Sequence, residues 1–206
     1  NSVVRWENDA SEMAEVNRQA NGQVAQTRRA SKYYFRPALS FSNRSVQFSV
    51  RWHPANYVFS VRGPAVVPLA ASSAYLLGFF NSRLVRALIQ MQTASQTYTS
   101  GVLKELRWVE PDDATRVRVE QLAVRAFAAC RECLGTIETD PCFAGLVPSS
   151  EVERVQDWNA YVDWQKSTAE SLNLLLRDCQ AGIDQSIAAL YGVASEDVER
   201  CERAEE

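Results

Sequence analysis

The sequence predicts an α+β fold: a small, mostly antiparallel sheet with flanking helices, followed by an all-helical hairpin or bundle. Between residues 33 and 62, apolar and polar side chains alternate, which is typical of half-buried strands. From Ser72 onward, apolar side chains recur every three or four residues, which is the period of a helix packed on one face. Pro111 interrupts the second pattern, so we expect an α+β domain over 1–111 and a helical domain over 112–206.

The expected α+β domain opens with a short polar helix over 9–20 and a basic loop over 21–32. Alternation then predicts three strands, over 33–41, 46–52 and 57–62. Turn-forming residues separate these stretches. Pro64 and Pro68 punctuate the next segment, as expected for a short edge strand.

The helical part begins with a helix predicted over 72–91, whose apolar stripe contains Leu77, Phe80, Leu84, Leu88 and Met91. A polar loop and a short strand-like segment at 107–111 follow. Beyond Pro111, long helices are predicted over 112–135 and from about residue 151 to Tyr191–Gly192, where the apolar face ends. Their 3-4 apolar spacing predicts an antiparallel hairpin or bundle, and an acidic tail ends the sequence.

The charges are strongly segregated along the chain. The net charge is −3, yet the 89 residues from Val16 to Lys104 contain nine Arg, two Lys and no Asp or Glu. Residues 105–206 contain ten bases and 21 acids. Such a basic block is the electrostatic footprint of a surface that binds a polyanion. The alternative is abundant arginine on a solvated surface, although such surfaces usually mix both signs.

No compact catalytic constellation is visible in the sequence. The eight glycines are scattered and form neither a dinucleotide-binding fingerprint nor a phosphate loop. His53 is the single histidine, which restricts catalytic triads and histidine metal sites. It lies in an expected turn, where a structural or phosphate-contacting role fits better than catalysis. Asp112 and Asp113 suit the positive start of a helix and need no catalytic explanation.

The five cysteines permit a zinc interpretation that we rank below free thiols. Cys130 and Cys133 form a CxxC pair and Cys142 follows, but no fourth ligand stands nearby. Cys130 also falls on the apolar stripe of its helix, so we expect it to be buried and reduced. Trp158 and Trp164 are expected to pack between helices instead of forming a platform for base stacking.

No apolar run approaches the roughly 18 residues of a membrane span, and residues 1–10 lack the apolar core of a signal peptide. We therefore expect a cytoplasmic protein without membrane contact.

Four features, in this order, resemble a known family. They are Phe48–Ser49–Arg51 on a strand pair, Phe80–Asn81–Ser82–Leu84 on a helix, the segment from Leu106 to Pro111, and Tyr191–Gly192 at a helix end. Together they resemble the C-terminal target-recognition region of bacterial adenine-specific (N6) DNA methyltransferases. The likeness spans about residues 33–192. It is strongest to the phage-growth-limitation (BREX-type) enzymes, and extends to their restriction–modification relatives.

The resemblance implies adenine-N6 methylation of DNA with S-adenosylmethionine, for self-marking in phage defence. The family's catalytic tetrapeptide has two adjacent prolines, and no two prolines are adjacent in this sequence. The family's glycine-bearing cofactor motif is also missing. We therefore expect a non-catalytic piece of a longer methyltransferase, with no cofactor of its own, that selects the target site while an upstream domain binds S-adenosylmethionine.

Double-stranded DNA is the expected partner, beside the upstream methyltransferase domain and other proteins of a defence complex. Phosphates or base edges are expected to contact the basic loop and sheet residues Arg28, Arg29, Lys32, Arg36, Arg44, Arg51 and Arg62. Finer recognition is assigned to the loop residues Gln96, Tyr98, Thr99 and Ser100. The alternative is a non-catalytic module that docks a protein through its helical hairpin. No metal site and no catalytic residue are expected.

Overall fold

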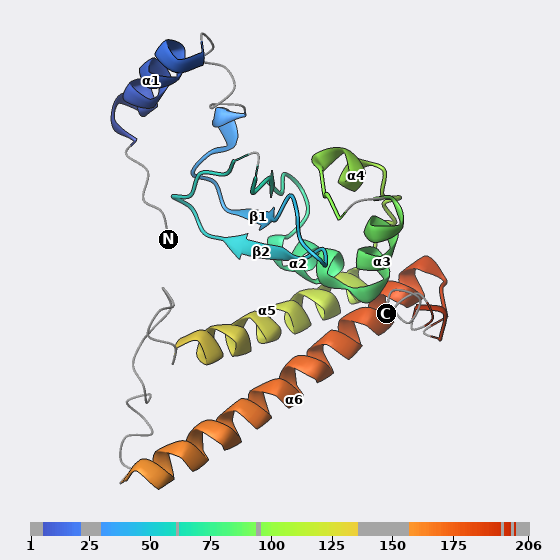
Figure 1. The fold of residues 1–206 in the computed structure, drawn as a ribbon. Coiled ribbons are helices and arrows are strands. Elements are labelled where there is room, and N and C mark those ends of the chain that lie inside the picture. Colours follow the sequence, from blue (N-terminus) through green and yellow to red (C-terminus); the bar gives the residue numbers. More distant parts are fainter. Residues whose placement is uncertain are drawn as a thin grey trace.

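A small antiparallel sheet lies at the centre of the fold, as the sequence predicts (Figure 1). The computed structural model describes residues 6–21, 30–60, 62–93, 96–135, 157–194, 196–198 and 200 of the 206. The strands are β1 (Ala38–Phe41), β2 (Val50–His53) and β3 (Ala65–Val66), in the order β2-β1-β3. Both pairs are antiparallel. The order makes β2 and β3 the two edge strands, and the prolines that flank β3 predict its edge position.

Helices pack on one side of the sheet and make up most of the described fold. In chain order the helical elements are η1 (Glu7–Ala10), α1 (Ser11–Asn21), η2 (Ser31–Tyr33), α2 (Ser73–Asn81), α3 (Arg83–Met91), α4 (Ser100–Lys104), α5 (Asp113–Gly135) and α6 (Trp158–Tyr191). Helix α2 packs on β1, β2 and α5, and α1 projects away from this body (Figure 1). The α+β class is therefore confirmed.

One face of the sheet is buried because side chains alternate along each strand. Leu39 and Phe41 of β1 and Val50 of β2 are buried. Trp52 points to the same side, where its ring lies 5.6 Å from that of Phe127 on α5. The sheet is thus fixed against α2 and α5, and its opposite face is turned outward.

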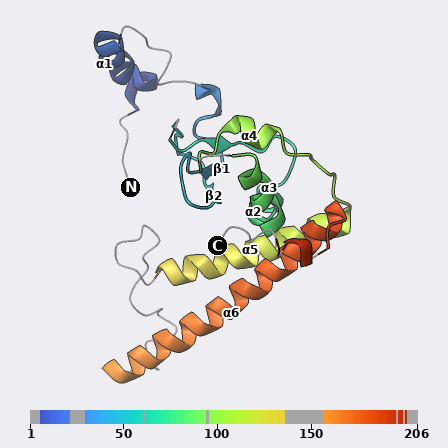
Figure 2. The same ribbon diagram turned by 45° about the vertical axis from the view of Figure 1, so that its right-hand side comes forward.

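Helices α5 and α6 form the expected antiparallel hairpin, and they diverge toward the start of α6 (Figure 2). Arg118 donates from Nη2 to Oε1 of Gln185 at 3.1 Å, while Leu122 lies against Gly182, three residues earlier on α6. A side chain at position 182 would place its Cβ 2.8 Å from Leu122 Cδ1, so glycine permits this close approach.

A single hydrophobic core extends over both sides of the domain boundary expected at Pro111. Phe48 and Tyr75 from the N-terminal side belong to the same cluster of buried side chains as Val119, Ile183 and Ile187. The two parts therefore share packing, and their separation into domains stays a prediction.

All three strands predicted over 33–62 differ from the structure: two are shorter, and the third is absent from the described residues. The first predicted strand begins at residue 38, because 33–37 form the end of a 3-10 helix, a turn and a bend, with Phe35 at φ 61°. The second begins at residue 50, and 46–49 are not part of it. Residues 57–60 form no strand; Phe35 N–H donates to Tyr57 O at 3.0 Å without a ladder. Alternation indicates a side-chain pattern, but a strand also needs a hydrogen-bonding neighbour, which these segments lack. The strand-like segment at 107–110 has no strand either.

The single helix predicted over 72–91 is divided at Ser82. The backbone of Ser82 is extended, with ψ 146°, and its buried hydroxyl donates to Phe79 O at 2.7 Å. Asp184 of α6 accepts the Arg83 N–H at 2.8 Å and so caps α3. After this break Met91 is exposed, contrary to its predicted place on the apolar stripe.

Cys130 is exposed instead of buried, and Ala129 takes the buried position on α5. Adjacent residues of a helix point about 100° apart, so Ala129 faces the protein while Cys130 is turned to solvent.

Candidate nucleic-acid interface

The outward face of the sheet carries a basic side chain on its edge strand. Arg51 lies opposite Ser40 in the β1–β2 register and is exposed, while its neighbours Val50 and Trp52 point into the protein. Two residues on, His53 shares this outward face. A strand whose inner side chains are fixed in the core positions these outer side chains on a rigid base.

Asn81 at the end of α2 holds β2 from its free edge. Its Oδ1 accepts the Val50 N–H at 3.0 Å, and its Nδ2 donates to Val50 O at 3.1 Å and to Leu77 O at 3.0 Å. The amide thus satisfies both main-chain groups that an edge strand leaves open. The asparagine of the Phe80–Asn81–Ser82 motif therefore supports the strand that carries Arg51.

His53 is uncharged near neutral pH in this environment. Burial lowers the pKa of its imidazole below the ordinary value of 6.5, and the positive charge of Arg51 lowers it further. Its ring lies 5.1 Å from that of Tyr57. The histidine therefore packs on Tyr57 beside Arg51 and is disfavoured as a further cation.

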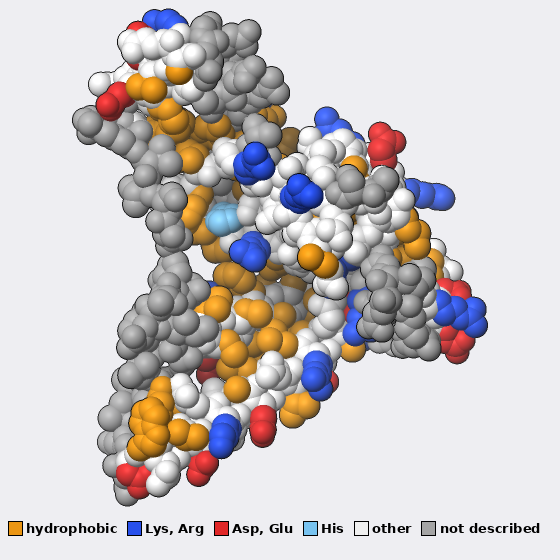
Figure 3. Space-filling model, in the orientation of Figure 1, with side chains coloured by type: hydrophobic (Ala, Val, Ile, Leu, Met, Phe, Trp, Pro, Cys, Tyr) orange, Lys and Arg blue, Asp and Glu red, His pale blue; other side chains and the backbone are white. Residues whose placement is uncertain are grey.

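Four arginines of the basic block are exposed and unpaired. Arg36, Arg44, Arg51 and Arg62 make no ion pair with any of the residues that the structure describes. Figure 3 shows Lys and Arg side chains gathered around the pale blue histidine, His53, on the face over the sheet. No acidic side chain stands among residues 16–104 to neutralise them.

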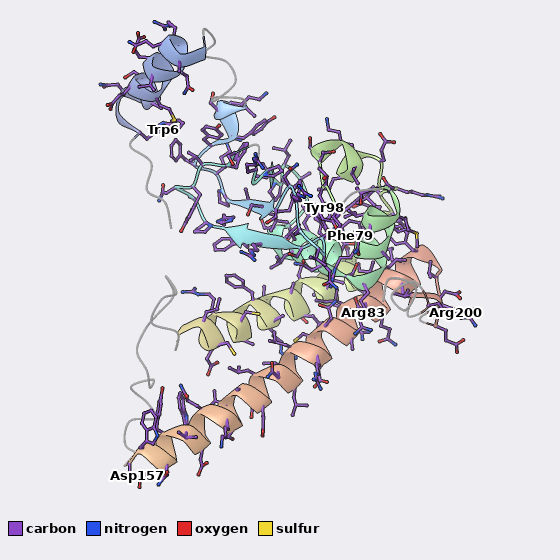
Figure 4. The ribbon with its side chains drawn as sticks, in the orientation of Figure 1. Trp6, Phe79, Arg83, Tyr98, Asp157 and Arg200 are labelled. Atoms are coloured by element: carbon purple, nitrogen blue, oxygen red, sulfur yellow. The ribbon has the colours of Figure 1, made fainter. Side chains whose placement is uncertain are left out.

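Arg83 differs from those four, because it is used inside the protein. Its Nε lies 3.2 Å from Oδ2 of Asp184, and it joins α3 to α6 (Figure 4). The contrast separates a structural arginine from cations that are free to bind a ligand.

A second part of the surface is formed by residues 43–47 lying against residues 96–98. Arg44 and Thr97 form an isolated antiparallel bridge, and Tyr98 N–H donates to Asn43 O at 2.7 Å. The Asn43 side chain returns a hydrogen bond to Tyr98 O at 3.0 Å. The expected recognition loop is thus brought beside Arg44.

Tyr98 is a correction to the predicted site. Its side chain is 1% exposed, and its ring packs 5.3 Å from that of Phe48 in the core (Figure 4). It therefore anchors the loop and does not contact DNA. Gln96, Thr99 and Ser100 are exposed and remain candidates.

The other predicted site residues are scattered around these two surfaces. Lys32 lies on η2, with Nζ 4.9 Å from the Tyr33 ring centroid, and Cζ of Arg36 lies 5.9 Å from the same centroid. Arg36 and Arg62 lie outside the three strands, contrary to their expected place, because the ladders are shorter than the alternation. Arg44 lies between β1 and β2, in the segment where a turn was expected. Arg28 and Arg29 fall outside the described residues.

Sequence reasoning missed the pairing of Gln47 with Arg86. Nη2 of Arg86 on α3 donates to Oε1 of Gln47 at 2.6 Å, across 39 positions of sequence. No local pattern marks such a pair, since it depends on how α3 packs beside the segment before β2.

No metal site or membrane-spanning helix is found in the described parts of the chain. No group of three or more His, Cys, Asp or Glu is arranged there to hold a metal ion. None of the helices seen there is both long and apolar enough to cross a membrane.

Comparison with known proteins adds no family to this geometry. No family model matches the chain, and no curated protein is significantly similar to it.

Proposed function

We propose that this chain is the DNA target-recognition part of an adenine-N6 methyltransferase of phage defence. The observation that carries the proposal is the set of exposed arginines, Arg36, Arg44, Arg51 and Arg62, that have no ion-pair partner among the described residues. Arginine binds phosphate in a bidentate way, and an uncompensated set of arginines attracts a polyanion over long range.

The order of the sequence features supports the methyltransferase class. Asn81 of one motif forms hydrogen bonds with the main chain of Val50 on β2. Ser82 of the same motif lies at the break between α2 and α3. Gly192 of another ends α6 in the left-handed region, at φ 66°, while Tyr191 donates its hydroxyl hydrogen to Arg107 O at 2.5 Å. These residues therefore have definite structural roles in a scaffold that presents Arg51.

The methyl donor and the catalytic motif would come from another part of the methyltransferase. The sequence has no adjacent prolines and no glycine-rich cofactor loop. We expect this chain alone neither to bind S-adenosylmethionine nor to methylate DNA. Isothermal titration with the cofactor tests this, and saturable micromolar binding would contradict it.

The salt dependence of DNA binding tests the proposed interface. Replacing Arg36 and Arg51 together by alanine removes two phosphate contacts, so the slope of log affinity against log salt should flatten by about 2 units, ~0.9 per contact. The matched control replaces Arg125 and Arg177, two exposed arginines of α5 and α6, and removes the same charge.

The control variant should retain the slope of the unmodified chain. Equal losses in both variants would mean that only net charge matters, and no duplex binding by the unmodified chain would refute the proposal. Melting temperatures measured on each variant separate lost contacts from lost folding.

The competing function, docking of a protein partner, is favoured by one observation. Trp158 at the start of α6 is 73% exposed, and its ring lies 5.4 Å from that of Tyr161, which in turn stacks on Trp164 at 6.2 Å. A Trp158→Ala variant should leave DNA binding intact under our proposal. Loss of a protein partner in this variant, together with no duplex binding by the unmodified chain, would favour the alternative.

A further inference from the structure

Arg86 of α3 is held by a hydrogen bond from its side chain to the segment that precedes β2. Its Nη2 donates to Oε1 of Gln47 at 2.6 Å in an exposed hydrogen bond. Its Nε is buried and has no acceptor among the described residues. The hydrogen bonding of this side chain is therefore incomplete inside the protein, although one end of its planar head is already held.

The segment that holds Arg86 is itself ordered by hydrogen bonds. Ser45 donates its hydroxyl hydrogen to Gln47 O at 2.6 Å, and Ser45 N–H reaches Gln96 O at 3.4 Å. Together with the Arg44–Thr97 bridge, these contacts join residues 43–47 to the 96–98 segment. Gln47 therefore lies on a supported loop instead of a free one.

Charge does not explain the pairing of Arg86. Asp184, the α6 carboxylate used by neighbouring Arg83, accepts from the main chain and side chain of that residue. Arg86 forms no ion pair with the described part of the chain. An uncharged glutamine orients the guanidinium and leaves its full positive charge available.

We propose that Arg86, held in place by Gln47, reads a guanine edge in the major groove. This inference rests on the proposed DNA-binding function and names the base contact within it. Guanine presents O6 and N7 as two acceptors, which a planar guanidinium satisfies with two parallel N–H donors. Direct readout needs a fixed donor geometry, and Gln47 supplies it.

The exposed arginines have the opposite character. Arg51 has no hydrogen-bond or ion-pair partner in the described structure, so its long side chain adapts to a phosphate of any sequence. Two classes of contact follow: adaptable cations that hold the duplex, and one oriented arginine that selects a base.

The experiment begins with selection from a randomised duplex library with constant flanks, using the full chain. The enriched duplex and a shuffled copy then serve as probes for each variant. Arg86→Lys keeps the positive charge but removes the two parallel N–H donors of the guanidinium. This variant should lose about 5- to 150-fold on the enriched duplex, with little change on the shuffled one.

Gln47→Ala provides a second test that keeps Arg86 itself. Because it removes only the orienting group, preference for the guanine position should fall in the same direction but less than in Arg86→Lys. Arg51→Ala is the control, and it should weaken both duplexes by the same factor. Melting temperatures should stay close to that of the unmodified chain for all three variants.

Three outcomes separate this inference from the function on which it rests. Equal weakening of both duplexes by Arg86→Lys would make Arg86 a phosphate contact and overturn the inference. An unchanged preference in Arg86→Lys and Gln47→Ala would overturn it as well. Failure of the unmodified chain to bind any duplex would instead refute the proposed function.

Discussion

Asn81→Ala is the sharpest test of how the scaffold presents the candidate interface. The substitution removes the amide that bonds both the N–H and the C=O of Val50, at 3.0 and 3.1 Å. It also removes a hydrogen bond to Leu77 O at 3.0 Å. Val50 is 4% exposed and precedes Arg51, so its main-chain groups lose their partners at a buried position.

The expected cost follows from the groups left without a partner. Each buried main-chain group that loses its hydrogen bond costs about 1–3 kcal/mol, and water can reach part of this half-buried site. We therefore expect the free energy of unfolding to fall by about 2 kcal/mol. Because β2 would be less firmly held, affinity for duplex DNA should fall as well, even though Arg51 is unchanged.

Urea unfolding measures the stability change, and hydrogen exchange at the β2 amides locates it. Asn17→Ala is the matched control, because Asn17 also donates to the carbonyl four residues earlier, Met13 O at 2.8 Å, but joins no other segment. We expect the control to change stability by less than ~0.5 kcal/mol. A similarly small stability change in Asn81→Ala, with the hydrogen-exchange protection of the β2 amides unaltered, would refute the role of Asn81 in holding β2.

Three further outcomes are expected. In Gly78→Ala the new Cβ would lie 2.7 Å from Cγ1 of Val119, so overpacking should cost about 1–3 kcal/mol in urea unfolding, and adding Val119→Ala should recover part of it. Gly192→Ala places a side chain at φ 66° in open space, and should lower stability by about 1 kcal/mol through backbone strain alone. For His53, burial and then the charge of Arg51 lower the pKa below 6.5, so the unfolded chain binds the proton more tightly. Stability should therefore fall as pH drops through 6.5, and an NMR titration should give a pKa that moves back toward 6.5 in Arg51→Ala. A titration at or above 6.5 in the unmodified chain would contradict this.

The sequence alone was sufficient for the helical hairpin and for the basic block. The apolar spacing on α5 and α6 depends on residues within one helix, and helical periodicity is a local property. Charge segregation is a property of the sequence itself, so the unpaired state of Arg36 and Arg51 could be anticipated from the lack of nearby acids.

Strand limits were less predictable because a strand requires a neighbour. Residues 57–60 alternate like β2, but no segment is placed to form a ladder with them. Likewise, the apolar period continued through Ser82, and the helix divides there because Asp184, a residue 102 positions away, caps α3.

The sequence by itself determined which half of the chain is basic and that two long helices follow it. Tertiary structure alone decided that Tyr98 is core and Cys130 exposed, and that Asn81 bonds Val50 and Gln47 holds Arg86. The physical reason is sequence separation. Helical periodicity and charge content can be read from residues that are near in the sequence, whereas burial and these hydrogen bonds depend on segments that meet only when the chain is packed.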